Sequence, residues 1–494
     1  MLLIVLLQVS CNRHPDVPSS AVVSGNLPGL YPDYTDVTLP VNLAAPSFMV
    51  TDASVSDVVA RFSYPGGTLT FGSGRKVIIP PADWRVISES SVDSIFTVTL
   101  FTQRDGQWLQ HPDFSIRVVS DTIDPWISYR LIEPSYVAYE KIDIMQRCLS
   151  DFTELTIASN HDERMQGEGH CLNCHSYQNG RTERMLFHVR GAGGGTMLVT
   201  DGKARLMPKM RQGSMISNPV YPSWHPHLPL VAFSTNHTGQ LFHTQSAAKI
   251  EVQDTESELV LYDVDADSMT VIPSDITDLE NFPTWSPDGR HLYYTSAHFE
   301  CHDSASFTDQ GHKEREFANR YTEVQYDIYV RDFDPSARTF SPRRLVLPMA
   351  THGYSASLPR VSPDGRFLLF ARGQFGCFHI WHSDADICML PLTESEEGTS
   401  SEVPVSVVDS LPLLNSSRAD SYPAWSSNGR WISFASRRTD GNYSRICFAY
   451  FDRDAHVHKA FILPQADPEY DLQLLRSYNR PEPMVMQAPC NIIR

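Results

Sequence analysis

The chain has 494 residues, 41% of them hydrophobic and 11% aromatic, which is enough to build a sizeable core in two or three domains. Its 58 acidic residues outnumber its 40 basic ones, so the formal charge is −18. Because no run of basic residues is longer than a pair such as Arg437-Arg438, the sequence argues against a nucleic-acid partner or an anionic-membrane surface.

The first thirty residues have the pattern of an exported lipoprotein. Residues 1–10 hold an apolar stretch that is too short to span a bilayer but suits a signal peptide. Ser10 precedes Cys11, and a small residue before a cysteine is typical of a site where bacteria attach lipid. The polar residues 11–30 then suit a lipidated tether. The alternative is a plain secretory signal followed by an incidental cysteine.

Residues 31–123 predict an immunoglobulin-like β-sandwich. Segments that alternate apolar and polar residues, such as 94–103 and 114–120, are bounded by Pro, Gly and Asp, as short antiparallel strands are. The sandwich and the repeats that follow it make the expected fold all-β.

Residues 124–464 contain repeats that predict a β-propeller. Related segments begin at Tyr221, Phe282, Leu358 and Tyr422, which are 61, 76 and 64 residues apart, and each precedes an apolar strand. Three of them end in Asp-Gly or Asn-Gly, the dipeptides of a tight hairpin. Outer strand pairs recur after them, and also at 142–159 and 195–208. We expect six blades, at 124–160, 161–212, 213–275, 276–349, 350–412 and 413–464. The first blade would take its inner strands from 126–141.

The pentapeptide Cys171-Leu172-Asn173-Cys174-His175 lies in the second of these blades. Its spacing is that of covalent c-type haem attachment, in which each thiol adds to a vinyl group and His175 becomes the proximal iron ligand. We expect the motif to replace the turn of an ordinary repeat and the blade at 161–212 to carry one haem c. The alternatives are a disulfide between Cys171 and Cys174, or a zinc site, which would need further ligands nearby.

A sixth iron ligand is expected from the strand after the motif or from the next blade. His188 is favoured and Met185 is an alternative; the two point to opposite faces of one strand, so only one can face the iron. His225 and His243 are further candidates. They belong to a histidine group with His227 and His237 that could instead hold a separate metal or simply be structural. A methionine ligand would raise the reduction potential relative to a second histidine.

Six cysteines remain after Cys11 and the haem motif are assigned. Of these, Cys377 and Cys388 flank one short segment and are the best candidates for a disulfide in an exported protein. Otherwise all six are small buried hydrophobes. Residues 465–494 predict a short helix at 470–479 and a Pro-rich tail that packs on the ring.

The repeats at 210–464 resemble the TolB-type β-propeller family. The chain after residue 120 resembles a family of exported bacterial TolB-like lipoproteins with an embedded Cys-x-x-Cys-His. The segments that carry this resemblance are YRLIEPSY (129–136), IMQRCLSDF (144–152), CLNCHS (171–176), RMLFHVRGAGGGTML (184–198), AFSTNHTGQLFH (232–243) and LLRSYNRPE (474–482).

We therefore expect a lipid-anchored, monohaem c-type cytochrome that faces the periplasm in the cell envelope of a Gram-negative bacterium. It would transfer electrons to, or sense the redox state of, an envelope partner. One alternative is a non-enzymatic propeller scaffold that binds a cell-envelope partner. Another is a haem-dependent reductase or peroxidase.

Overall fold

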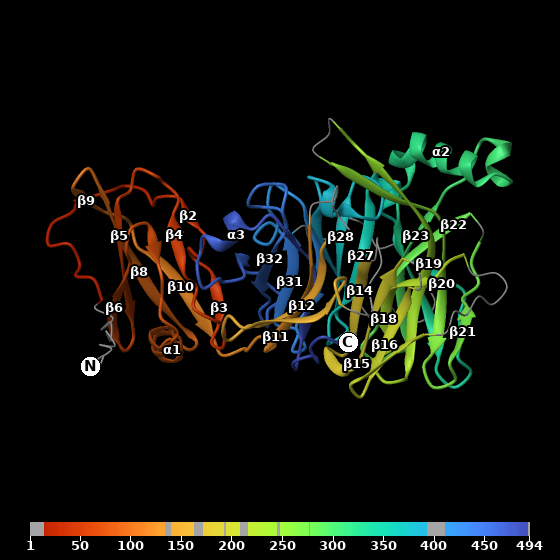
Figure 1. Ribbon diagram of the computed structural model, residues 1–494, viewed down its shortest axis with the longest axis horizontal. Coiled ribbons are helices and arrows are strands. Elements are labelled where there is room, and N and C mark those ends of the chain that lie inside the picture. Colours follow the sequence, from red (N-terminus) through yellow and green to blue (C-terminus); the bar gives the residue numbers. More distant parts are fainter. Residues whose placement is uncertain are drawn as a thin grey trace, which may run out of the picture. The chain divides into compact units, whose positions relative to one another are not determined.

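The computed structural model describes residues 14–133, 140–162, 171–191, 194–207, 216–244, 248–275, 277–392 and 411–492. Two compact units make up the chain: Met1–Thr122 with Pro464–Gln473, and Ile123–Leu463 with Leu474–Arg494. Both are built mainly from β-strands, as expected (Figure 1). The predicted signal peptide and Cys11 lie outside the described residues. None of the helices described has the length and apolarity needed to cross a bilayer.

The first unit contains two sheets and one longer helix. Its seven-stranded sheet consists of β1 (Val22–Val23), β3 (Thr38–Pro40), β5 (Asp57–Tyr64), β6 (Gly67–Phe71), β8 (Ser94–Arg104), β9 (Gln107–Gln110) and β10 (Phe114–Val119). Its three-stranded sheet consists of β2 (Leu30–Tyr31), β4 (Phe48–Val50) and β7 (Lys76–Val77). Helix α1 (Pro81–Ser90), which the sequence analysis did not predict, packs Trp84 against Phe96. Lys76 holds the 464–473 segment, which carries α3 (Tyr470–Gln473), through Asp467 and Glu469 at 2.9 and 2.8 Å.

The second unit is a succession of antiparallel strand groups. Its strands are β11 (Trp126–Ile132), β12 (Ile142–Cys148), β13 (Glu154–Ser159), β14 (Cys171–Gln178), β15 (Arg181–Arg190), β16 (Gly195–Thr200), β17 (Lys203–Leu206), β18 (Pro219–Trp224), β19 (Leu230–Phe242), β20 (Ile250–Asp263), β21 (Ser268–Val271), β22 (Asp278–Trp285), β23 (His291–His298), β24 (Asp327–Asp334), β25 (Thr339–Phe340), β26 (Arg344–Leu347), β27 (Ser355–Val361), β28 (Phe367–Gly373), β29 (Asp386–Pro391), β30 (Asp420–Trp425), β31 (Trp431–Ser436), β32 (Arg445–Tyr450), β33 (Phe461–Ile462) and β34 (Ser477–Met484). Its helices are α2 (Gln310–Arg320) and the short 3₁₀ turns η3 (Ser304–Phe307), η4 (Tyr321–Glu323), η5 (Ala350–His352) and η6 (His379–Trp381).

The groups follow one another as the blades of a β-propeller do. The first strands β14, β18, β22, β27 and β30 contact one another in that order, and β30 contacts β34. Strand β34 pairs with β11, and β11 and β12 contact β14, so the succession returns to its start. One parallel pair, Ser257 with Leu279, joins two groups into a nine-stranded sheet. No described sheet closes on itself.

The predicted turns form as their residues require. Gly289, Gly365 and Gly429 have φ of 71°, 76° and 66°, which glycine adopts without strain. Ahead of Gly289, the Ser286 hydroxyl donates to Asp288 and accepts from the His291 N–H at 2.9 Å, so the turn closes on its own side chains.

Two of the repeated tryptophans tie their strand group to the preceding one. The indole N–H of Trp285 donates to the Ser223 carbonyl on β18, and that of Trp425 donates to the Arg360 carbonyl on β27, both at 3.2 Å.

Two expectations for the ends of this unit were wrong. Only 470–473 of the predicted helix is helical, and 477–484 is the strand β34. This strand, rather than 126–141 alone, completes the group of β11, β12 and β13. Its pairing with β11 links residues more than 340 positions apart, such as Ser128 and Glu482, which no local pattern could indicate.

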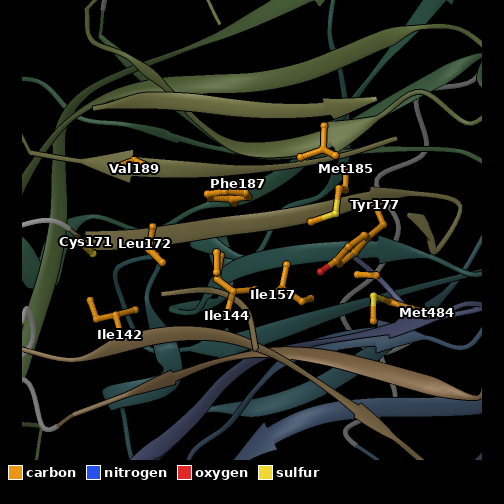
Figure 2. Close-up of a cluster of buried hydrophobic side chains, with 13 residues drawn as sticks. Ile142, Ile144, Ile157, Cys171, Leu172, Tyr177, Met185, Phe187, Val189 and Met484 are labelled. Carbon is orange, nitrogen blue, oxygen red and sulfur yellow. The ribbon is translucent and has the colours of Figure 1, made fainter. Parts of the chain in front are cut away.

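The pentapeptide lies in a strand and not in a turn. Cys171–Gln178 forms β14, the first strand of its group, and the turn is the following Asn179-Gly180 pair, with Gly180 at φ 67°. One side of β14 packs on an apolar cluster that includes Ile144, Phe187 and Met484 (Figure 2).

Candidate functional site

Six residues with left-handed backbone line one channel in the propeller unit. They are Cys174, Tyr221, Phe282, Leu358, Tyr422 and Arg480, with φ between 51° and 55°. Each lies where the pairing of a first strand with its neighbour shifts register, as at a β-bulge. Bulky side chains rarely adopt this conformation, and such strain is concentrated at functional sites. The bulges therefore mark the channel as the candidate site.

A proline follows five of these six residues. At a bulge the missing N–H of proline costs no ladder hydrogen bond, so Pro222, Pro283 and Pro359 suit their positions, as do the prolines after Tyr422 and Arg480. In β14 the corresponding residue is His175. The Cys174-His175 dipeptide is thus the one departure from a repeated structural feature.

Both thiols of the motif are free and both line the channel. Cys171 and Cys174 are 5% and 8% exposed, so neither is open to bulk solvent on the outer surface. The cross-strand partner of Cys171 is Arg190, and the Asn173 amide lies 2.8 Å from the Cys171 sulfur. The disulfide alternative is not formed in this structure.

His175 is fully buried and has one ring nitrogen to spare. Its Nε2 lies 3.0 Å from the Arg480 carbonyl oxygen, to which it donates, and its Nδ1 has no partner among the described residues. Burial, followed by the charges of Arg480 and Arg130, holds the pKa of His175 well below its usual value. A neutral imidazole with one N–H tied to a backbone carbonyl and the other nitrogen free is the arrangement that metal-ligating histidines adopt.

None of the four candidates for a sixth ligand lines the channel. Met185 packs inside the apolar cluster of Figure 2. The Nδ1 of His188 lies 3.1 Å from the Thr196 hydroxyl, and burial, then Arg190, lowers the pKa of His188 to about 3. His243 stacks near Tyr321, with ring centroids 5.9 Å apart.

His225 has a structural position in a turn. Its Nε2 donates to the Gly289 carbonyl at 3.0 Å, and its Nδ1 accepts the N–H groups of His227 and Leu228. Burial lowers the pKa of His225 to about 4. His237 instead pairs with Glu256 at 3.3 Å, so the histidines of this region have separate partners.

A metal-like spacing of His, Cys, Asp or Glu occurs among the described residues at Asp452, Asp454 and His456, in a turn that is mostly exposed. Cys171, Cys174 and His175 form no such group with any described residue. The zinc alternative therefore gains no support from the structure.

The expected Cys377–Cys388 disulfide is not formed in this structure, in which both cysteines are buried. They belong to different apolar clusters: Cys377 packs with Tyr326 and Phe282, whereas Cys388 packs with Phe370. The two cysteines flank one short segment, but that segment contains η6 and the start of β29. These elements carry the two cysteines into separate clusters.

The channel is strongly basic, which sequence analysis missed. Its lining contains Arg130, Arg190, Lys249, Arg360, Arg437 and Arg480, against one carboxylate, Glu133. Burial lowers the pKa of Arg360 and of Arg437 to about 10, with Arg480 adding to the effect on Arg360, and both remain charged at neutral pH. The Arg437 guanidinium lies 3.6 Å from the ring centroid of Trp381. One sequence signal could have placed Arg480 in the channel: a proline follows it, as a proline follows four of the other bulge residues.

No family model matches the chain, and no curated protein matches it. Among solved structures it is similar to the β-propeller domain of the Trilobed protease from Pyrococcus furiosus, at 7% identity and TM-score 0.35, covering 75% of this chain and 95% of that one. It is also similar to the Dos1 propeller, at 9% identity and TM-score 0.32, covering 69% and 86%. A puromycin-hydrolyzing peptidase of Mycobacterium tuberculosis matches at 11% and 0.32, covering 67% of this chain and 46% of the peptidase.

The chain thus spans less than half of that peptidase. Similarities this weak say nothing about function, and the propeller arrangement rests on the strand order and contacts within the chain itself.

Proposed function

We propose that this chain is a binding module: a TolB-type propeller of six blades, closed by β34, that holds a ligand in its central channel. The supporting observation is that all six strained bulges line one channel, together with two free thiols. Strained backbone at six equivalent positions lowers stability, and such strain is typically retained where a site binds a ligand. The first unit serves as an immunoglobulin-like sandwich.

Alkylation of Cys174 tests whether the channel is the binding site. The full chain, made without haem attachment, is treated with iodoacetamide in the presence of citrate, pyrophosphate, maltose or ferric haem. Peptide mass mapping then gives the alkylation rate of Cys174 and of the exposed Cys490, which is an internal control. We expect at least one probe to slow Cys174 about tenfold and leave Cys490 unchanged. If none of the four protects Cys174, the channel is not the binding site.

A second candidate is the c-type cytochrome, which the spare Nδ1 of His175 favours. The residues present fit a covalent haem. Cys171 and Cys174 would bond to its vinyl groups, and His175 would supply the proximal nitrogen. The basic residues of the channel would pair with its carboxylates. The haem would supply one-electron transfer to an envelope partner. Burial keeps His175 neutral, and the Arg480 carbonyl orients its ring.

His188 as sixth ligand stays a prediction. It would have to exchange its hydrogen bond with Thr196 for the iron. The spectrum of a loaded chain decides the point: six-coordinate low-spin haem that becomes high-spin in His188→Ala supports the prediction, and an unchanged spectrum contradicts it. No described contact favours a reductase or peroxidase over electron transfer.

Expression in a host that attaches haem separates the two candidates. A c-type absorption spectrum, and a haem mass that survives denaturation and is lost in Cys171→Ser/Cys174→Ser, would establish the cytochrome. Cys490→Ser is the matched control and should keep the haem. A colourless native chain would leave the binding module alone.

We also propose that the protein is exported, lipid-anchored through Cys11 and exposed to the periplasm. The apolar stretch that ends before Cys11 supports this proposal. The intact mass of the mature protein from its own envelope tests it: a lipid mass on Cys11 is expected, and an unmodified first residue elsewhere contradicts it.

A further inference from the structure

Three of the channel arginines converge beside the motif, although they come from distant strands. Arg480 is the bulge residue of β34, and Arg130 on β11 faces Asn479 across the same pair of strands. Arg360 follows the bulge proline of β27. The charges of Arg130 and Arg480 both lower the pKa of His175, and that of Arg480 also lowers the pKa of Arg360. Arg360 and Arg480 therefore lie close enough to repel each other, and Arg130 lines the same channel near His175.

These arginines form no close ion pair with a described carboxylate. Arg130 donates to the Leu172 carbonyl at 3.4 Å, and Arg360 donates to the neighbouring Pro359 carbonyl at 3.0 Å. The Nε of Arg480 is buried without a partner. The buried Glu482 attracts Arg360 and Arg480 without a close ion pair, and burial raises its own pKa, so it compensates the two arginines only in part.

The rest of the channel has the same character. Glu133, the one carboxylate in the lining, is taken by Arg476 at 3.3 Å. The lining also includes aromatic residues, among them Tyr221, Phe282 and Tyr422. A chain of formal charge −18 has thus concentrated positive charge in one partly buried channel. Buried cations that one carboxylate compensates only in part are costly, and an anion from solution would offset that cost.

We propose that the channel binds a small anionic ligand whose carboxylate or phosphate oxygens are held by Arg130, Arg360 and Arg480, beside Cys174 and His175. Guanidinium groups suit this role because their planar donors match two oxygens at once. The inference rests on the channel being the binding site, as proposed above. The oxygens have two possible sources: the propionates of an attached haem, or a free polycarboxylate or phosphate compound.

Calorimetric titration of the full chain, made without haem attachment, tests the class of ligand. We expect citrate or pyrophosphate to bind, with an affinity that falls as sodium chloride rises. Arg360→Gln/Arg480→Gln should weaken binding at least tenfold. The matched control is Arg366→Gln, since Arg366 pairs with Asp364 on an exposed turn and does not line the channel. Arg130→Gln alone is a milder variant that should still weaken binding.

A second readout separates ligand binding from a structural role. Removing Arg360 and Arg480 relieves their mutual repulsion, and the buried Glu482, whose pKa burial already raises, can take up a proton in their absence. The ligand-free variant should therefore be about as stable as the native chain, whereas losing a structural contact would lower the urea midpoint. The proposal is overturned if neither anion binds, or if the arginine variants bind both as tightly as the native chain. Protection of Cys174 by maltose but by neither anion would overturn this inference and leave the channel as the binding site.

The haem-loaded chain then identifies the source of the oxygens. If haem attaches and the loaded chain no longer binds citrate, the propionates occupy the arginines. If the loaded chain binds citrate as tightly as the colourless chain, or if no haem attaches, the natural ligand is a free oxyanion. Each of these results supports the proposed class of ligand and selects one source.

Discussion

Strands β14 and β22 occupy equivalent positions in the propeller, yet they end their bulges differently. In β22, Phe282 with φ 52° precedes Pro283; in β14, Cys174 with φ 55° precedes His175. The backbone is the same in both, so the fold does not need the histidine. What β14 gains is a thiol in the channel and a buried imidazole with a free nitrogen. The same bulge geometry thus accommodates either a proline or the Cys174-His175 pair.

The largest effect should come from making β14 resemble the other repeats. Cys174→Leu/His175→Pro copies the Leu358-Pro359 pair of β27, so we expect the chain to fold with nearly native circular dichroism. If the native chain attaches haem in a haem-attaching host, this variant should carry none, because one thiol and the proposed ligand are gone. Haem-stained gels and intact mass measure this outcome. Retention of haem by the variant would show that the bulge dipeptide is not the attachment site.

The pH dependence of the unfolding free energy should differ between the strand group of β14 and the strand group of β22. Burial lowers the pKa of His188 to about 3, whereas the usual value for histidine is about 6.5. The stability that the neutral, buried ring contributes is therefore fully present above about pH 6.5. As the pH falls below that, only the unfolded chain takes up the proton. The unfolding free energy should then fall by about 1.4 kcal/mol per pH unit, and less steeply in His188→Gln.

Glu280 on β22 should show the opposite sign. Burial raises its pKa to about 7, against a usual value near 4.5, so the folded chain keeps a proton that the unfolded chain releases. The contribution of Glu280 to the unfolding free energy is fully present below about pH 4.5. It declines as the pH rises toward 7, by at most about 1.4 kcal/mol per pH unit. Urea unfolding of Glu280→Gln from pH 4 to 8 measures this slope. A slope equal to the native one would contradict the assignment.

The smallest effect concerns the proline itself. Pro283→Ala should lower the unfolding free energy by about 0.4–1 kcal/mol, because alanine gives the unfolded chain more freedom while the bulge stays the same. The urea midpoint measures it. An unchanged midpoint would mean that the proline does not stabilise the bulge, and that its replacement by His175 in β14 was free of cost.

The sequence predicted the repeats well because their signals are local. Asp288-Gly289 and the strand after it need only neighbouring residues to form a hairpin, and the outer pairs at 142–159 and 195–208 formed as expected. Helix α1 was missed because its residues lie between strands and lack a strong apolar stripe. The motif was identified, but its place in a strand was not, since a positive φ at Cys174 has no sequence signature.

The basic channel could not be predicted, because Arg130, Arg360 and Arg480 meet only when β11, β27 and β34 do. Their separation in sequence hides the cluster, and the overall acidity of the chain pointed the other way. The sixth ligand and the lipid anchor remain predictions that the contacts described do not test.

The pairing of β34 with β11 has a consequence for biogenesis. Residues 477–484 emerge from the ribosome more than 340 residues after the strand they join. Until then β11 lacks the strand that pairs with it in the complete chain, and the channel lacks Arg480. Any modification of the cysteines in β14 that occurs before these residues emerge would therefore act on a chain in which Arg480 is not yet beside Cys174.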